Sequence, residues 1–188
     1  MKALLLTLIG VIYFVSSLKS ALAQPKPFGL ELGVHTKEET LEVIKKEGGK
    51  VTKSGCRIIK GDIANCEVEG VEVEDLPLED LIKATFWFYK NRLFKIEYVF
   101  PLSMSKEEFY VIHKQLTQRY GNPKKFVKPY LANGRAEWHF QNIRLYLLAP
   151  WVSWSMYLTY EHLPLSRESE ISDRKVFERE TAKPRKGL

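Results

Sequence analysis

The chain has 188 residues, of which 45% are hydrophobic and 28% are charged. This balance excludes a disordered chain, and the length predicts one domain or two very small ones. The net charge of +6 comes from dispersed lysines and arginines, with Lys124, Lys125 and Lys128 as the densest cluster in the body of the chain. Such a surface suits an anionic lipid, a nucleic acid or an acidic protein, but a solvated mixed-charge surface is the simpler interpretation.

The first 23 residues have the pattern of a secretory signal peptide. Lys2 is followed by an apolar run over 4–15 and by Ala21-Leu22-Ala23, the small residues that precede a cleavage site. We expect a mature chain that begins at Gln24 and is periplasmic or secreted; a retained membrane anchor is the alternative. The rest of the chain has no apolar stretch of the ~20 residues that a transmembrane helix needs.

Cys56 and Cys66 are the two cysteines, and an exported chain meets an oxidising environment. A hairpin folded about Gly61 places them opposite each other, which predicts a disulfide. A three-residue loop, Lys60 to Asp62, is preferred, because a two-residue turn places the sulfurs on a diagonal. The alternative is a redox or metal pair, but the spacing is not that of a redox motif and no histidine is close in sequence.

Two segments are predicted to be helices. Thr36-Lys37-Glu38-Glu39 is a capping box, and that helix ends at Gly48-Gly49. Ser105-Lys106-Glu107-Glu108 is a second box, followed by apolar residues at three- and four-residue steps as far as Tyr120.

The aromatic stretch 84–100 is predicted to be a β-hairpin around which the chain is organised. Phe86 and Phe88 share one face of the first strand. Phe94, Ile96 and Tyr98 share one face of the second. For both sets to lie on the same face, Phe88 must lie opposite Phe94, which requires a three-residue turn with Arg92 in the left-handed conformation.

A second hairpin is predicted over 136–147, with a two-residue turn that places Phe140 opposite Ile143. A last strand follows over 154–160. We therefore expect an α+β fold with a signal peptide at 1–23, a domain at 24–164 and a charged, mobile tail at 165–188. The domain is expected to contain two tandem helix-plus-antiparallel-sheet units, an αβββ-type repeat, over about 28–101 and 102–164.

This pattern resembles small exported bacterial proteins. Gly33-Val34-His35-Thr36 and the helix behind it look like the opening of BamE-like envelope proteins. The helix, meander and repeat look like the β-lactamase-inhibitor-protein-like superfamily. Gln24 stands where a lipoprotein has cysteine, so the resemblance implies the fold rather than membrane anchoring or a function.

No catalytic residues, metal ligands or cofactors are predicted. The four histidines lie apart in the sequence, and there is no nucleophile motif or phosphate-binding glycine loop. His139 and Glu137 on one strand face are the best candidates for an acid–base pair, but neighbours of this kind are usually solvated.

The candidate binding residues are the aromatic residues Trp87, Tyr89, Trp151, Trp154 and Tyr157. Exposed tryptophan and tyrosine often anchor protein interfaces. The predicted function is that of a non-enzymatic exported module that engages an envelope or secreted protein through an aromatic sheet face, without nucleic acid. The alternative is a carrier of a small hydrophobic ligand or lipid between sheet and helices.

Overall fold

A computed structural model describes residues 24–130 and 132–182. The predicted signal peptide, 1–23, lies outside the described residues, as do Leu131 and the last six residues. The elements, in chain order, are the 3-10 turn η1 (Pro27–Gly29), α1 (Lys37–Lys46), β1 (Lys50–Lys60), β2 (Ile63–Glu74), β3 (Lys83–Tyr89), β4 (Arg92–Pro101), α2 (Glu107–Tyr120), β5 (Lys125–Val127), β6 (Gly134–Phe140), β7 (Ile143–Ala149), β8 (Ser155–His162) and α3 (Leu163–Thr181).

The strands form one antiparallel sheet of eight strands in the order β1-β2-β3-β4-β8-β7-β6-β5. The α+β class with an antiparallel sheet is therefore confirmed. Each half of the fold consists of a helix and then a four-stranded antiparallel meander. Each half therefore has one strand more than the expected αβββ unit. They join where β4 pairs with β8, with Ile96 opposite Tyr160 and Tyr98 opposite Leu158.

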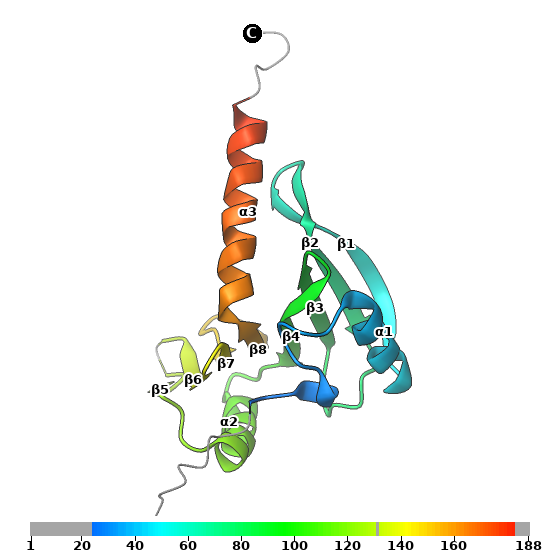
Figure 1. Ribbon diagram of the computed structural model, residues 1–188. Helices are drawn as coiled ribbons and strands as arrows, with labels where there is room; N and C mark the ends of the chain where they lie inside the picture. Colours follow the sequence, from blue (N-terminus) through cyan, green and yellow to red (C-terminus); the bar gives the residue numbers. More distant parts are fainter. Residues whose placement is uncertain (1–23, 131, 183–188) are drawn as a thin grey trace, which may run out of the picture.

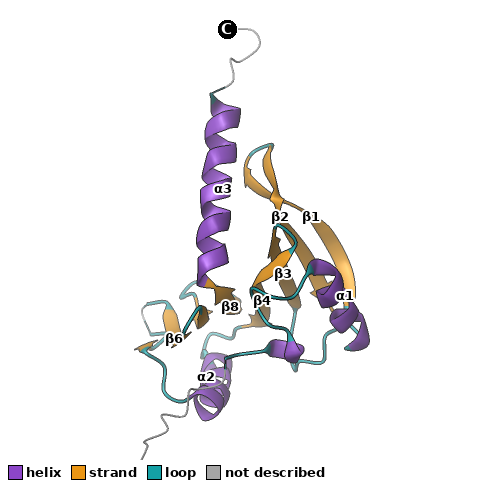
Figure 2. Cartoon of the chain, in the orientation of Figure 1, coloured by secondary structure: helices purple, strands orange, loops and turns teal. Residues whose placement is uncertain are grey.

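The two helices that precede the meanders, α1 and α2, pack on the same face of the sheet, which carries the main apolar core (Figure 2). Phe86, Ile96 and Leu145 from the strands are buried there beside Ile44 of α1 and Phe109 of α2. We call this side the apolar face. The other side, which α3 approaches, we call the polar face.

The helix starts agree only in part with the predicted capping boxes. The box at α1 is confirmed, because the Thr36 side chain accepts from the Glu39 N–H and Glu39 accepts from the Thr36 N–H. At α2 the prediction is wrong: Lys106 occupies the N-cap in a left-handed conformation, with no side-chain cap. The Glu108 carboxylate instead accepts from the N–H and hydroxyl of Ser103.

The central hairpin forms, but its predicted register is wrong. The turn has two residues, Lys90 and Asn91, both with positive φ, and Tyr89 pairs with Arg92. This is the turn geometry that fits the right-handed twist of adjoining strands. A bulge follows, so that Phe88 lies opposite Leu93 and the additional residue, Phe94, packs on the polar face.

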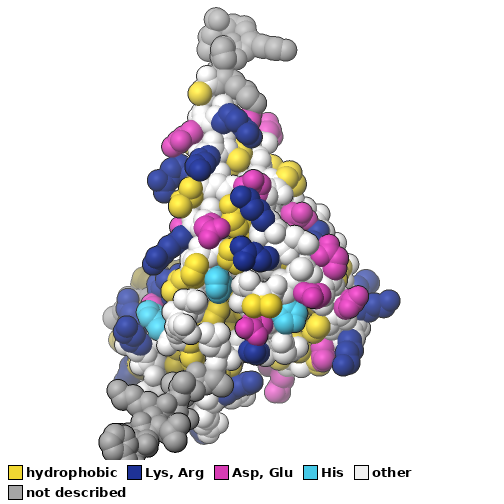
Figure 3. Space-filling model, in the orientation of Figure 1, with side chains coloured by type: hydrophobic (Ala, Val, Ile, Leu, Met, Phe, Trp, Pro, Cys, Tyr) yellow, Lys and Arg dark blue, Asp and Glu magenta, His cyan; other side chains and the backbone are white. Residues whose placement is uncertain are grey.

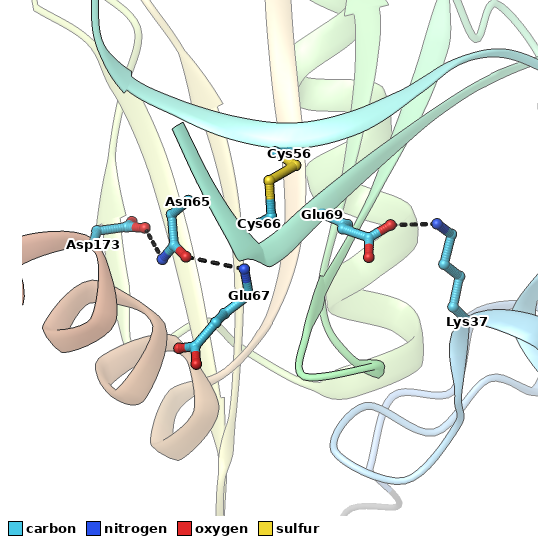
Figure 4. Close-up of a disulfide and its surroundings, with 7 residues drawn as sticks. All are labelled: Lys37, Cys56, Asn65, Cys66, Glu67, Glu69 and Asp173. Carbon is cyan, nitrogen blue, oxygen red and sulfur yellow. Dashed lines mark hydrogen bonds and ion pairs between the residues drawn. A yellow bond between two sulfur atoms is a disulfide. The ribbon is translucent and has the colours of Figure 1, made fainter. Parts of the chain in front are cut away.

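The Cys56–Cys66 disulfide is confirmed and joins β1 to β2 (Figure 4). The preferred three-residue loop is wrong, because Lys60 pairs with Ile63 across a two-residue turn. Irregular pairing near the cysteines accommodates the bridge: Cys56 lies opposite Glu69 rather than opposite Cys66.

The segment after 164 was predicted to be a mobile tail, and α3 corrects this. The helix leaves the end of β8 and runs beside the β1–β2 hairpin (Figure 1). A stripe of small residues, Ser166, Ser169 and Ser172, is buried against the sheet together with Leu165. The rest of α3 carries interspersed basic and acidic side chains (Figure 3), which gave the segment its tail-like composition. The predicted domain boundary at 164 therefore falls at the start of a docked helix.

A candidate ligand pocket under helix α2

A cavity of about 700 Å³ lies between helix α2 and the apolar face of the sheet. Small-molecule sites typically measure ~300–1,000 Å³ and have mostly apolar walls. The walls of the cavity come from helix α2, from strands β4 and β8, and from η1 together with the segment before β3. They include Ile112, Leu116, Tyr98, Phe100, Met156, Leu158, Tyr160, Phe28 and Leu78.

The cavity is elongated along α2. Glu107 at the start of the helix and Arg119 near its end both line the cavity. Twelve helical residues correspond to about 18 Å at 1.5 Å per residue. On the sheet side, the residues of β4 that line the cavity extend from Pro101 to Tyr98. An elongated apolar molecule therefore matches the cavity better than a compact one.

Tyr98 supplies a buried polar group in this wall. Its side chain is 2% exposed, and within the described residues its hydroxyl has no hydrogen-bond partner. Its ring makes an edge contact with Tyr160, with 6.0 Å between centroids. Burial raises the pKa of the Tyr98 phenol well above its ordinary value, so the hydroxyl stays protonated and is able to donate. Burial also raises the pKa of Tyr160, which lies close to Tyr120.

The two ends of the cavity differ in charge. Arg119 lies at the end that holds the three tyrosines, with its guanidinium 5.4 Å from the Tyr120 ring centroid. At the other end the lining includes Glu107 and Glu108, beside Pro101. The tyrosine end therefore offers donors and a positive charge, whereas the glutamate end is acidic.

The aromatic residues predicted as a binding surface do not come together in one place. Trp87 lies across Gly70 and under the Arg57 guanidinium, which is 4.8 Å from its ring centroid. Tyr89 is buried beside Phe94 and Leu165.

The other three predicted residues lie elsewhere. Tyr157 is half-buried on β8, where it pairs with Val99 and Leu148. Trp151 and Trp154 are exposed in the loop between β7 and β8. The sheet face around Trp87 and Tyr89 is thus covered by Arg57 and α3, while the two loop tryptophans face solvent.

The pair considered for acid–base chemistry lies on the polar face. His139 Nε2 is 3.3 Å from Glu137 Oε2, and Arg135 also contacts this carboxylate. Burial raises the pKa of Glu137, but the hydrogen bond with His139 and the charge of Arg135 together hold it below the ordinary value. Glu137 is therefore an ionised partner of two neighbouring side chains, which suits a structural pair. No group of three or more potential metal ligands occurs among the described residues.

Sequence reasoning missed the cavity. The alternation in β4 correctly placed Tyr98 on the same face as Ile96, and this gave one signal: a tyrosine at an otherwise apolar inward position. The contribution of Phe28 and Leu78 had no such signal, because short irregular segments carry no periodicity.

The fold and the cavity define an α+β protein with one antiparallel sheet and an apolar pocket beneath a helix. The chain matches the TP0088 domain over residues 26–172 and belongs to this family. Comparison with curated proteins gave no match, and comparison with solved structures gave none either. The matched span continues through Ser172, so it includes the buried serine stripe with which α3 docks on the sheet. Among the described residues no helix combines the length and apolar character of a membrane span.

Proposed function

We propose that this protein binds a small, elongated hydrophobic ligand with a polar head in the cavity under α2. One observation supports this more than any other: Tyr98 lines an apolar cavity of about 700 Å³, and its hydroxyl is buried without a partner among the described residues. A buried hydroxyl without a hydrogen bond costs roughly 1–3 kcal/mol. A ligand that offers an acceptor to Tyr98 recovers that cost. Ligand binding would therefore account for a tyrosine at this buried position.

The donors at the tyrosine end define the chemistry of the head. A protonated phenol donates to an acceptor such as a carboxylate, ester or phosphate oxygen. Arg119 at the same end favours an anionic head. The apolar body then extends along α2 past Ile112 toward Pro101. A single-chain amphiphile such as a fatty acid has this distribution of polar and apolar groups.

The proposed role is binding without catalysis, in an exported protein. Its alternative, a protein partner held by an aromatic sheet face, has less support, because Arg57 covers Trp87 and Tyr89 is 5% exposed. The repeat of the helix-and-meander order on either side of the β4–β8 pair supports a tandem duplication, and with it the resemblance to the β-lactamase-inhibitor-protein-like superfamily. In such a duplication β3 corresponds to β7, and β4 corresponds to β8.

Filling the cavity tests the proposal. Ile112→Trp places a large ring in the cavity wall, whereas Lys114→Trp adds the same ring to an exposed position of α2 that does not line it. The ligand probe is a dansyl-labelled fatty acid, followed by its fluorescence. We expect Ile112→Trp to weaken binding by about tenfold or more, since overpacking costs ~1–3 kcal/mol. Lys114→Trp should bind as the wild type does.

Mass spectrometry of gently purified wild-type protein adds an independent measurement, because a bound amphiphile is expected to appear as a discrete mass. The proposal fails if the wild type does not bind the probe, or if Ile112→Trp and Lys114→Trp bind it equally well. Circular dichroism of both variants shows whether each retains the fold, and Tyr98→Phe, discussed below, tests the same site without adding volume.

A further inference from the structure

The loop between β7 and β8 presents large apolar side chains to solvent. Trp151, Val152 and Trp154 are 52%, 88% and 72% exposed. Met104, 76% exposed, lies in the loop between β4 and α2, and Tyr130, 77% exposed, lies in the loop between β5 and β6. We call these five residues the loop patch. Soluble proteins rarely expose such a group without a binding role.

The backbone beneath the loop patch is firmly held. The Leu102 N–H donates to the Trp154 carbonyl, at 2.9 Å, and the Lys106 ammonium donates to the Ser153 carbonyl, at 3.2 Å. On the other side the Trp151 N–H donates to the Asn133 side chain, at 2.8 Å. These bonds link the three loops at one end of the sheet. The apolar side chains are therefore presented by a fixed backbone.

We propose that the loop patch docks the protein on the surface of a lipid bilayer that contains anionic lipid. Tryptophan and tyrosine favour the headgroup level of a bilayer, and valine and methionine suit the acyl region below it. The neighbouring strand β5 and its loops carry the exposed lysines Lys124, Lys125 and Lys128. Basic residues beside an apolar tip complement an anionic membrane surface. Glu107 at the start of α2, and Glu79 and Asp80 before β3, are exposed acidic residues that line the cavity.

The loop patch is continuous with the cavity under α2. Pro101 pairs with Ser155, and both Pro101 and Met156 line the cavity at its glutamate end. Trp154 lies one residue before this pair and is bonded to Leu102. Docking through the loop patch therefore places that end of the cavity against the bilayer, where apolar ligands are dissolved. Docking itself needs no ligand, so it stands apart from the function proposed above.

The test compares two double variants. Trp151→Ser with Trp154→Ser removes two apolar side chains of the loop patch. Ile58→Ser with Ile171→Ser removes two exposed apolar side chains elsewhere, which are 63% and 49% exposed. Vesicles of phosphatidylcholine with about one third phosphatidylglycerol, and of phosphatidylcholine alone, are mixed with each protein and floated on a density gradient.

We expect the wild type and the isoleucine variant to float with the anionic vesicles, and the tryptophan variant to lose about tenfold or more of its affinity. Wild-type binding should weaken with added salt and on phosphatidylcholine alone. Brominated phosphatidylcholine should quench wild-type tryptophan fluorescence. The tryptophan variant should still bind the dansyl-labelled fatty acid, so a failure of ligand binding and a failure of docking give different results.

Three outcomes overturn the proposal: a wild type that does not float, equal losses in the two double variants, or unchanged floating of the tryptophan variant. Sedimentation adds a fourth. If the wild type is a dimer in the absence of vesicles and Trp151→Ser/Trp154→Ser is a monomer, the loop patch binds a second copy of the chain instead.

Discussion

On the polar face of the sheet, where α3 docks, buried polar groups pair with one another; on the apolar face, under α2, a buried polar group borders a cavity. The docking of α3 joins Arg57 to Asp173 at 2.8 Å and Asn65 to Ser172 at 3.0 Å. Tyr98 has neither kind of partner among the described residues. In the described part of the chain the polar face also contains two unpartnered donors, the Thr159 hydroxyl and the Trp87 indole N–H, but neither residue lines the cavity.

This difference separates stability from binding. Mutually satisfied polar groups hold a helix of low apolar content on the sheet, and there is no reason to expect them to recognise a ligand. An unpartnered donor on a residue that lines a cavity is different, because a ligand in the cavity would lie next to that residue. We therefore expect substitutions near α3 to change the free energy of unfolding, and substitutions near Tyr98 to change ligand affinity.

The largest expected effect comes from the disulfide, which closes the hairpin on which α3 docks (Figure 4). Cys66 lies between Asn65 and Glu67, and both of these bind Ser172. Cys56→Ser with Cys66→Ser should lower the free energy of unfolding by about 2–3 kcal/mol, because the reduced chain regains the entropy of the open loop. Urea unfolding followed by circular dichroism measures this.

Ligand binding should survive the loss of the disulfide under conditions in which the variant is folded, because neither cysteine lines the cavity. Wild-type protein treated with dithiothreitol provides the matched control and should unfold at the same urea concentration as the double variant. A fall in affinity for the dansyl-labelled fatty acid as large as that of Ile112→Trp would mean that the two faces are not separable.

A smaller effect, of opposite sign, is expected at the two unpartnered hydroxyls. Tyr98→Phe and Thr159→Val each remove a buried group that lacks a hydrogen bond in the described part of the chain. Each should raise the stability of the ligand-free protein by about 1 kcal/mol. Only Tyr98→Phe should weaken binding of the labelled fatty acid, by roughly three- to tenfold, which corresponds to one lost hydrogen bond.

The two substitutions make a matched pair, because both are expected to raise the free energy of unfolding by a similar amount. A difference in ligand affinity between them therefore reports on the cavity alone. Equal affinities of the two variants for the probe would remove Tyr98 from the site. A destabilised Tyr98→Phe variant would show that this hydroxyl has a structural partner.

The regular spacing of apolar residues along the sequence predicted the strands that carry those residues. The two-residue spacing of Phe86 and Phe88, and of Trp138 and Phe140, correctly predicted strand positions that face the core. The predicted pairing of Phe140 with Ile143 is also confirmed. A bulge leaves no mark on composition, so the transfer of Phe94 to the polar face was not predictable from alternation alone.

The docking of α3 was missed for a different reason. Its buried stripe consists of Ser166, Ser169 and Ser172, which sequence analysis counts as polar. Each hydroxyl has a hydrogen-bond acceptor: Ser166 donates to Glu161 at the end of β8, and Ser172 donates to Glu67 of β2. Ser169 donates to the Ser166 carbonyl within α3. Small satisfied residues allow the helix to approach the sheet without an apolar pattern. The cavity likewise depends on segments distant in sequence.

The smallest expected effect concerns pH at the junction of β8 and α3. The His162 ring caps α3 by accepting from the Leu165 N–H, at 3.4 Å, and packs on Gly33. Burial and then the charge of Arg92 lower the pKa of His162 below its ordinary 6.5, although Glu168 acts in the opposite direction. Because the folded pKa lies below the unfolded one, the unfolded chain binds the proton more tightly. The contribution of His162 is therefore complete above about pH 6.5 and is lost as the pH falls through the folded pKa.

His162→Asn tests this assignment, because asparagine retains a capping acceptor but does not titrate. Between about pH 7.5 and 5.5 the wild type should lose a fraction of a kcal/mol more stability than the variant, a small figure because solvent screens a half-exposed ring. Urea unfolding at the two pH values gives the difference. Titration of His113, whose pKa burial also lowers, cancels because both proteins contain it. Parallel pH profiles would show that the junction does not sense protonation, and a change in fatty-acid affinity across this range would show that the polar face does influence the cavity.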